Sequence, residues 1–181
     1  MTAPSSALVR VAQRAMNQMA DRNTPFVNNE WYVVAFVGEV GRSLLRRTVL
    51  GRPLVLYRTS AGAPVALDDR CPHRSYPLSA GRLDGNTIVC GYHGLRFDAA
   101  GDCIEIPSQA TCPKGIGVRA YPLVERGPFI WGWFGEPAHA NPASIPATPW
   151  LESDQWTGSQ DYFHLPGNYV SLHENLLDLT H

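Results

Sequence analysis

Two short segments that each pair a cysteine with a histidine constrain this sequence more than any other feature. The first is Cys71-Pro72-His73 and the second is Cys90-Gly91-Tyr92-His93, with sixteen residues between His73 and Cys90. Each segment follows a β-type run and carries proline or glycine, so we expect both to lie in loops. Thiolates and imidazoles are ligands of transition metals. The pattern therefore predicts two loops that hold a metal group between their tips.

The residue types alone leave three interpretations of these four side chains open. They could be two buried thiols and two surface histidines with no joint role. They could form a tetrahedral zinc site, although zinc sites usually keep cysteines and histidines in separate pairs. They could also hold a [2Fe–2S] cluster in which one iron takes two thiolates and the other takes two imidazoles, which explains why each segment is mixed.

The rest of the chain has a mainly β pattern. Glycine and proline number 16 and 15 of 181 residues, an excess that favours a turn-rich β protein over a helix bundle. From Trp31 onward, β-type runs separated by turn residues recur about every ten residues, which is typical of an antiparallel β-sandwich. We expect Trp131 and Trp133, which alternate in one run, to lie in the core. The expected strands are 31–37, 48–50, 54–58, 65–67, 87–90, 118–121 and 129–134.

Charge and hydropathy exclude two classes of partner. Lys and Arg total 15 against 16 Asp and Glu, for a net charge of −1, so we expect no non-specific binding to nucleic acid. The longest apolar run, residues 31–37, is far shorter than the roughly 18 residues that span a membrane. We therefore expect no membrane partner, and the first 25 residues lack the apolar core of a secretory signal.

The pattern Cys-x-His-x16-Cys-x2-His, followed by Gly94, resembles the Rieske [2Fe–2S] proteins. The flanking residues resemble their oxygenase branch; they are Asp69-Arg70, Arg74 and Leu95-Arg96-Phe97-Asp98. This resemblance implies that Cys71 and Cys90 bind one iron of the cluster and that His73 and His93 bind the other.

The same resemblance indicates the redox range of the cluster. Rieske proteins of respiratory chains add a cysteine to each loop, and here those positions hold Tyr76 and Tyr92. Those proteins also place Ser and Tyr hydroxyls against the cluster, at positions held here by Leu95 and Phe97. Because hydrogen bonds to the sulfurs raise the reduction potential, we expect a potential near the low end of the Rieske range.

The last residues resemble the start of the mononuclear iron site of Rieske oxygenases. A capping box at residues 171–174 predicts a helix that begins there, which would place Asp178 and His181 on one helical face. The resemblance implies that His181 is the first ligand of a 2-His-1-carboxylate iron(II) site. It implies that Asp178 bridges His181 to His93 of a neighbouring subunit, and that Asn175 lies beside the iron.

We expect three parts in the chain. Residues 1–26 form an N-terminal extension with a short helix, and residues 27–137 form the Rieske domain. Residues 138–181 form a proline-rich connector and the beginning of an α+β catalytic domain. Within this part, residues 161–170 are of β type. The other ligands of the mononuclear iron would lie beyond His181, so we expect a fragment that carries the cluster without oxygenating a substrate.

The resemblance implies an oxygenase component, with vanillate O-demethylase and dicamba monooxygenase as the most similar types. A reductase or ferredoxin would supply electrons to the cluster, and the mononuclear iron(II) would activate O2 for monooxygenation, O-demethylation or hydroxylation of an aromatic substrate. The resemblance also implies a cyclic homo-oligomer, commonly a trimer, in the bacterial cytoplasm. The alternative is a Rieske ferredoxin, which carries electrons without catalysis of its own.

The remaining cysteines and histidines have structural interpretations. We expect Cys103 and Cys112 to be free structural thiols, since the four cluster positions are already filled. We expect His139, His164 and His173 to be surface or packing residues.

Overall fold

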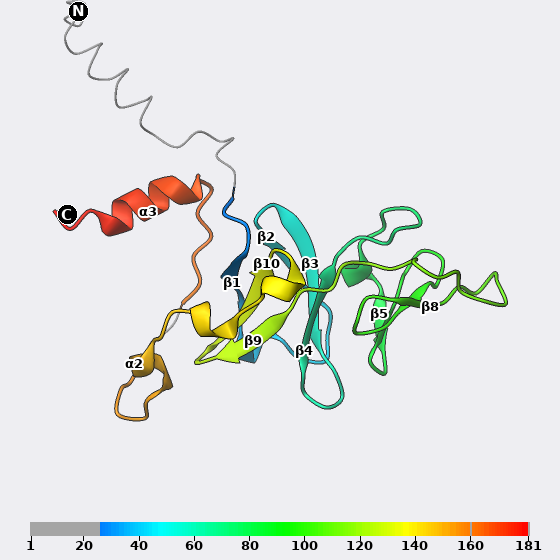
Figure 1. The fold of residues 1–181 in the computed structure, drawn as a ribbon, viewed down its shortest axis with the longest axis horizontal. Helices are drawn as coiled ribbons and strands as arrows, with labels where there is room; N and C mark the ends of the chain where they lie inside the picture. The colour runs from blue at the N-terminus through cyan, green and yellow to red at the C-terminus, as the bar shows by residue number, and fades with distance from the viewer. Residues whose placement is uncertain (1–25, 160, 181) are drawn as a thin grey trace, which may run out of the picture. The chain divides into compact units, whose positions relative to one another are not determined.

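The computed structural model describes residues 26–159 and 161–180 (Figure 1). The helix expected within residues 1–26 lies outside the described residues, apart from Phe26. The chain divides into a compact unit from Val27 to Gly158 and a second unit that contains the described residues from Ser159 onward. The two units are described separately below.

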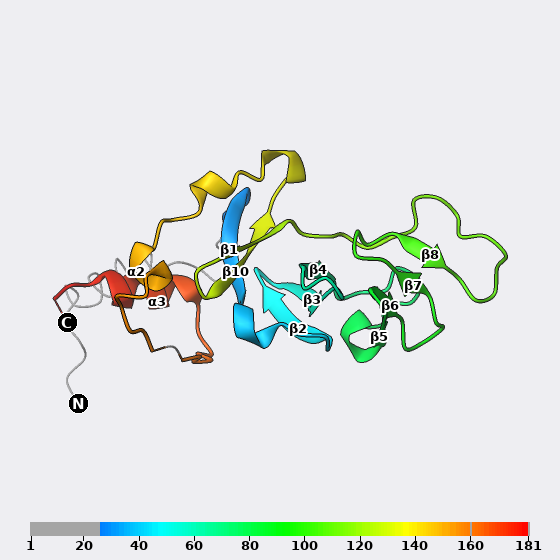
Figure 2. The same ribbon diagram turned by 90° about the horizontal axis from the view of Figure 1, so that it is seen from below.

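Three antiparallel sheets build the unit from Val27 to Gly158, which confirms the expected antiparallel β architecture. The first sheet has the order β1-β10-β9, the second β2-β3-β4 and the third β5-β6-β7-β8. The second sheet lies between the other two in both ribbon views (Figures 1 and 2). The strands are β1 (Glu30–Phe36), β2 (Leu45–Val49), β3 (Arg52–Arg58), β4 (Pro64–Asp68), β5 (Arg82–Asp84), β6 (Thr87–Val89), β7 (Arg96–Phe97), β8 (Cys103–Glu105), β9 (Leu123–Arg126) and β10 (Phe129–Phe134).

Strand β3 separates two hydrophobic cores. Successive side chains of a strand point to opposite faces, and the four consecutive residues from Leu54 to Tyr57 are all fully buried. Leu54 and Leu56 pack into the core shared with β1 and β10, whereas Val55 and Tyr57 pack into the core shared with the third sheet. Burial on both faces explains why this strand is a continuous apolar run.

The second of these cores contains the two cysteines of the sequence pattern. Cys71 and Cys90 are 2% and 3% exposed, and they pack with Leu78, Ile88 and Phe97. Cys71 follows β4 and Cys90 follows β6, so the end of each of these strands delivers one cysteine to the same core. The fold therefore brings the two halves of the pattern together through strands of different sheets.

The connector after β10 packs against the first sheet. Ile145 is buried against Trp31 and Trp133, and the indole N–H of Trp31 donates to the Asn141 carbonyl at 2.9 Å. Trp133 lies in this core as expected, whereas Trp131, two residues earlier on the same strand face, packs against the core but is only partly buried. The connector contains the 3-10 helices Pro137–His139 and Pro142–Ser144 and the short helix α2 (Pro149–Glu152). The domain boundary expected at residue 137 stays a prediction.

The strand predicted at residues 118–121 is wrong, and the β-type residues at 161–170 form no strand either. Residues 118–121 form only a single bridge, between Leu67 and Ala120, because Pro122 follows and has no N–H to continue a ladder. Residues 161–170 form no strand where the structure describes them, since no neighbouring strand pairs with this segment. The short strands β5, β7, β8 and β9 were not among the expected strands.

The helix α3 (Tyr169–Leu177) begins before the expected capping box and ends before Asp178. Its N-cap is Asn168, whose side chain accepts from the Val170 N–H at 2.9 Å. Asp178 has extended backbone angles and its Oδ1 accepts from the Thr180 N–H and hydroxyl at 3.0 and 2.6 Å. This local turn competes with the helix, so the placement of Asp178 on a helical face is wrong.

No helix within the described residues is both long enough and apolar enough to cross a membrane.

Candidate metal centre

The two loops that carry the pattern share one backbone arrangement. In each loop the cysteine N–H donates to the carbonyl five residues later, and the N–H four residues later donates to the cysteine carbonyl. These bonds, 2.8–3.0 Å long, join Cys71 to Tyr76, Ser75 to Cys71, Cys90 to Leu95 and Gly94 to Cys90. Ser75 and Gly94 stand at the same place in the two loops, and both are left-handed, with φ of 55° and 75°. The two loops therefore have the same backbone hydrogen-bond pattern and the same left-handed position.

The two cysteine thiols lie side by side in the core. Burial raises the pKa of the Cys71 thiol, the backbone N–H of His73 lowers that pKa, and a hydrogen bond with the Cys90 thiol raises it. The backbone N–H of Arg74 also interacts with the Cys71 sulfur and lowers the pKa. These N–H groups are placed to stabilise a thiolate once a metal displaces the proton.

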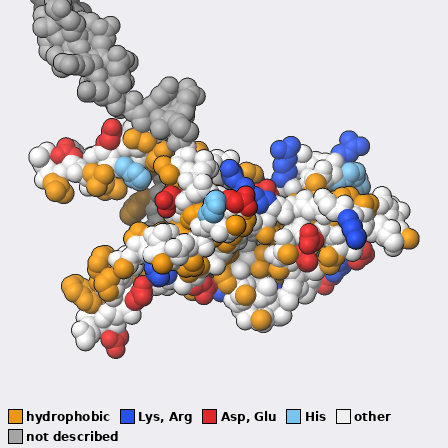
Figure 3. Space-filling model, viewed as in Figure 1, with side chains coloured by type: hydrophobic (Ala, Val, Ile, Leu, Met, Phe, Trp, Pro, Cys, Tyr) orange, Lys and Arg blue, Asp and Glu red, His pale blue; other side chains and the backbone are white. Residues whose placement is uncertain are grey.

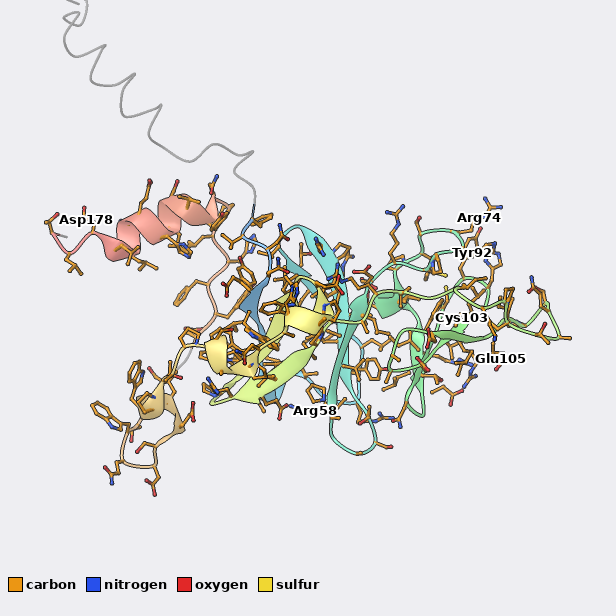
Figure 4. The ribbon with its side chains drawn as sticks, viewed as in Figure 1. Arg58, Arg74, Tyr92, Cys103, Glu105 and Asp178 are labelled. Carbon is orange, nitrogen blue, oxygen red and sulfur yellow. The ribbon has the colours of Figure 1, made fainter. Side chains whose placement is uncertain are left out.

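The two histidines lie together at the surface. The ring centroids of His73 and His93 are 4.7 Å apart, with an interplanar angle of 60°. Both residues are exposed, and Tyr92, whose ring centroid is 3.9 Å from that of His93, is 57% exposed. Figure 4 shows Tyr92 and Arg74 projecting from the two loops at the end of the unit that carries the third sheet.

A cavity of about 460 Å³ opens beside the histidines. Its walls are mainly apolar, with Ser108 and Gln109 as hydroxyl and amide groups. The lining residues are Pro72, His73, His93, Leu95, Ile106, Pro107, Ser108, Gln109 and Ile116. Residues 106–109 follow β8, and the sequence pattern gave no signal that they approach the histidines, because β7 and β8, whose pairing brings them there, are too short to show in the sequence.

The arrangement fits a pair of irons better than a single metal ion. Cys71 pairs with Cys90 in the core, and His73 pairs with His93 at the surface. Across residues 26–159 and 161–180, no three His, Cys, Asp or Glu side chains gather where one metal ion could bind them all. A tetrahedral zinc site requires four ligands around one point, whereas a Rieske cluster requires two ligands at each of two irons.

Comparison with known proteins agrees with this geometry. The family described as the Rieske [2Fe–2S] domain matches residues 30–122, which include both loops and all four residues of the pattern. The chain belongs to this Rieske family. Its cofactor is therefore a [2Fe–2S] cluster, and the expected fold class is confirmed.

Several curated Rieske proteins are similar to most of this chain. The iron–sulfur subunit of the toluene-4-sulfonate monooxygenase system of Comamonas testosteroni is 44% identical over 157 residues, which are 86% of this chain and 45% of that protein. The oxygenase component of dicamba O-demethylase from Stenotrophomonas maltophilia is 43% identical, over 86% of this chain and 46% of that protein. The chain thus spans less than half the length of these relatives.

A solved structure of dicamba monooxygenase with non-heme iron and dicamba has a similar fold. It superposes with a TM-score of 0.82 at 42% identity, over 87% of this chain and 49% of that chain. The match extends beyond residues 30–122, so the similarity also includes residues outside the Rieske domain.

The C-terminal residues of the predicted second site are placed only in part. Asn175 lies on α3 and lines a separate cavity of about 440 Å³ with residues such as Phe163 and Leu172. Asp178 is exposed just after α3, and its hydrogen bonds with Thr180 lower its pKa. His181 lies outside the described residues.

The other cysteines and histidines belong to neither pair, although Cys103 shares the core of Cys71 and Cys90. Cys103 is buried and its thiol donates to the Glu105 carbonyl at 3.6 Å; burial and, to a smaller extent, the neighbouring Cys112 thiol raise the pKa of Cys103 to about 12. Both cysteines are free thiols. His139, His164 and His173 are exposed, in agreement with their expected surface positions.

We predict that Gly94→Ala reduces the [2Fe–2S] content of the purified protein. The left-handed φ of 75° costs alanine roughly 1–2 kcal/mol, and the added Cβ would lie 3.2 Å from Pro107 Cγ. The matched control is Gly62→Ala, because Gly62 has a φ of 84° and open space around it. Iron and acid-labile sulfide should fall in the first variant only, and equal loss in both would contradict the prediction.

Proposed function

We propose that Cys71 and Cys90 hold one iron of the cluster and that His73 and His93 hold the other. The observation that carries this proposal is the separation of the four side chains into a buried thiol pair and an exposed imidazole pair, supplied by two loops of equal backbone geometry. When bound, the cluster supplies reversible one-electron transfer.

The burial of the cysteines and the exposure of the histidines indicate on which side electrons leave the cluster. The buried cysteines keep water away from one side of the site, whereas His73 and His93 present their rings at the surface. An imidazole that binds a metal through one nitrogen keeps a second nitrogen for a hydrogen bond. We infer that the histidine side is where a carboxylate or a partner protein approaches and where electrons leave.

Replacement of any one of the four proposed ligands by serine or alanine should abolish the visible absorbance of the cluster. The matched controls are Cys103→Ser and Cys112→Ser, because these cysteines lie in or against the same core and have no assigned role. Iron and sulfide analysis of the purified variants checks the prediction. A Cys71→Ser protein with full cluster content, or a Cys103→Ser protein with none, would refute the ligand set.

The reduction potential of the cluster should be negative against the standard hydrogen electrode. Two positions where respiratory-chain Rieske proteins place hydroxyl groups are held by buried Leu95 and Phe97, and Leu95 also lines the cavity beside the histidines. Apolar side chains donate no hydrogen bonds to the sulfurs, so the reduced cluster gains less stabilisation. A redox titration that gives a strongly positive midpoint would contradict this expectation.

We further propose that the whole protein is the oxygenase component of a bacterial Rieske system. Such a component would act in the cytoplasm on an aromatic substrate by monooxygenation, O-demethylation or hydroxylation. The similarity to proteins named as a toluene-4-sulfonate monooxygenase subunit and a dicamba O-demethylase oxygenase component supports this proposal, and a reductase or ferredoxin would supply its electrons. The mononuclear iron(II) would supply O2 activation, with His181 as one ligand and Asn175 beside it.

In this proposal Asp178 links the two metal sites. Its exposed carboxylate could accept a hydrogen bond from His93 of a neighbouring subunit and another from His181, because both imidazoles have a second nitrogen. The interaction with Thr180 favours the ionised carboxylate that this role requires. The proposal therefore includes a cyclic homo-oligomer, such as a trimer, in which one subunit's cluster serves the next subunit's iron.

Turnover by the protein at the full length of its relatives tests the proposal. With a reductase, NADH and an aromatic methoxy or sulfonate substrate, O2 uptake should match product formation. Asp178→Asn should lower the turnover number by at least tenfold while the cluster remains reducible. A full-length protein that accepts and donates electrons but consumes no O2 with any such substrate would instead be a Rieske electron carrier.

A further inference from the structure

Asp69 is the one charged residue in the described part of the chain that is classed as buried. It is 3% exposed and stands two residues before Cys71. Its carboxylate accepts from the Ser79 N–H at 2.6 Å and from the Ser79 hydroxyl at 2.7 Å. Arg46, whose side chain is 63% exposed, places Nε 3.4 Å from the same carboxylate. Because burial of a carboxylate is costly, such a complete set of partners indicates a specific role.

Ser79 belongs to a turn that contacts both cluster loops. It lies in the 3-10 helix Leu78–Ala80, and Leu78 is fully buried in the core that contains Cys71 and Cys90. A Cβ at Gly91 would lie 3.0 Å from the Ala80 carbonyl oxygen, so this turn lies directly against the second loop. Asp69 therefore joins the start of the first loop to the turn at residues 78–80, and this turn packs against the second loop at Gly91.

The start of the first loop is also fixed by the backbone. The Asp69 N–H donates to the Pro53 carbonyl on β3 at 2.9 Å. The carboxylate thus connects the central sheet, at Asp69, with the turn at Ser79. The segment between them carries Cys71 and His73, whose spacing from the second loop must be kept for two irons to be shared.

We propose that Asp69 is a positioning residue for the cluster and that its fixed negative charge lowers the cluster's reduction potential. The inference rests on the proposed ligands. A buried anion two residues from a proposed cluster ligand favours the oxidised state, because reduction adds a further negative charge. Arg46 offsets only part of this effect, since its side chain is mostly in solvent.

Two substitutions separate the charge of Asp69 from its hydrogen bonds. Asp69→Asn removes the charge, while the amide can still accept from the Ser79 N–H and donate to its hydroxyl oxygen. Ser79→Ala removes the hydroxyl bond, while the charge and the N–H bond remain. We expect a raised midpoint potential with a retained cluster in the first variant. We expect an unchanged potential and a severalfold faster loss of cluster to a chelator in the second.

The matched control is Asp68→Asn. Asp68 is the adjacent carboxylate, but it accepts the Tyr121 hydroxyl at 2.6 Å, and Tyr121 belongs to the other core. This variant should retain its cluster as long as the unmodified protein and shift the potential less than Asp69→Asn does. Equal potential shifts at the two positions would overturn the electrostatic part of the inference.

If Ser79→Ala loses its cluster no faster than the unmodified protein, the inference that Asp69 positions the cluster loops is overturned.

The Cys71→Ser variant tests the ligand proposal separately in the same experiment. If Cys71→Ser loses the cluster while the Asp69 and Ser79 variants behave like the unmodified protein, the ligands stand and the inference about Asp69 fails. If Cys71→Ser retains the cluster, the ligand proposal itself fails.

Discussion

The structure depends on one constraint: two thiols must meet inside a hydrophobic core while two imidazoles only two or three residues away must meet at the surface. A single loop could not easily supply both pairs. Two loops with the same hydrogen bonds do so, because each places its cysteine at the buried end and its histidine toward the tip. The basic and histidine side chains exposed at this end of the molecule are visible in Figure 3.

The core beneath the loops explains why the rest of the fold is needed. Strand β3 contributes alternate residues to two cores, and the core on the side of the third sheet contains both cysteines. Leu78 and Phe97, both fully buried, pack in this core, one from the turn after the first loop and one from β7. Close packing of these residues limits how far either cysteine can move, which a cluster with fixed bond lengths requires.

The sequence predicted the features that depend on local chemistry. Residue type and spacing predicted the four residues of the pattern. Continuous apolar runs predicted the long strands, such as β3 and β10. Strands of two to four residues, such as β7 and β9, are too short for a periodic signal and exist through their partners. The segment 161–170 has β-type residues but no strand to pair with.

Asp178 lies outside the helix because its carboxylate accepts hydrogen bonds from the N–H and hydroxyl of Thr180, two residues later. The burial of Asp69 depends on Ser79, ten residues away, and spacing alone does not reveal it.

The most direct test of the central claim is pulsed EPR of the reduced protein after labelling of its histidines with nitrogen-15. The account predicts hyperfine coupling of the cluster to two imidazole nitrogens, with one coupling lost or altered when His73 or His93 is replaced by cysteine. A reduced cluster that couples to no histidine nitrogen would show four thiolate ligands or an adventitious site and would contradict the account.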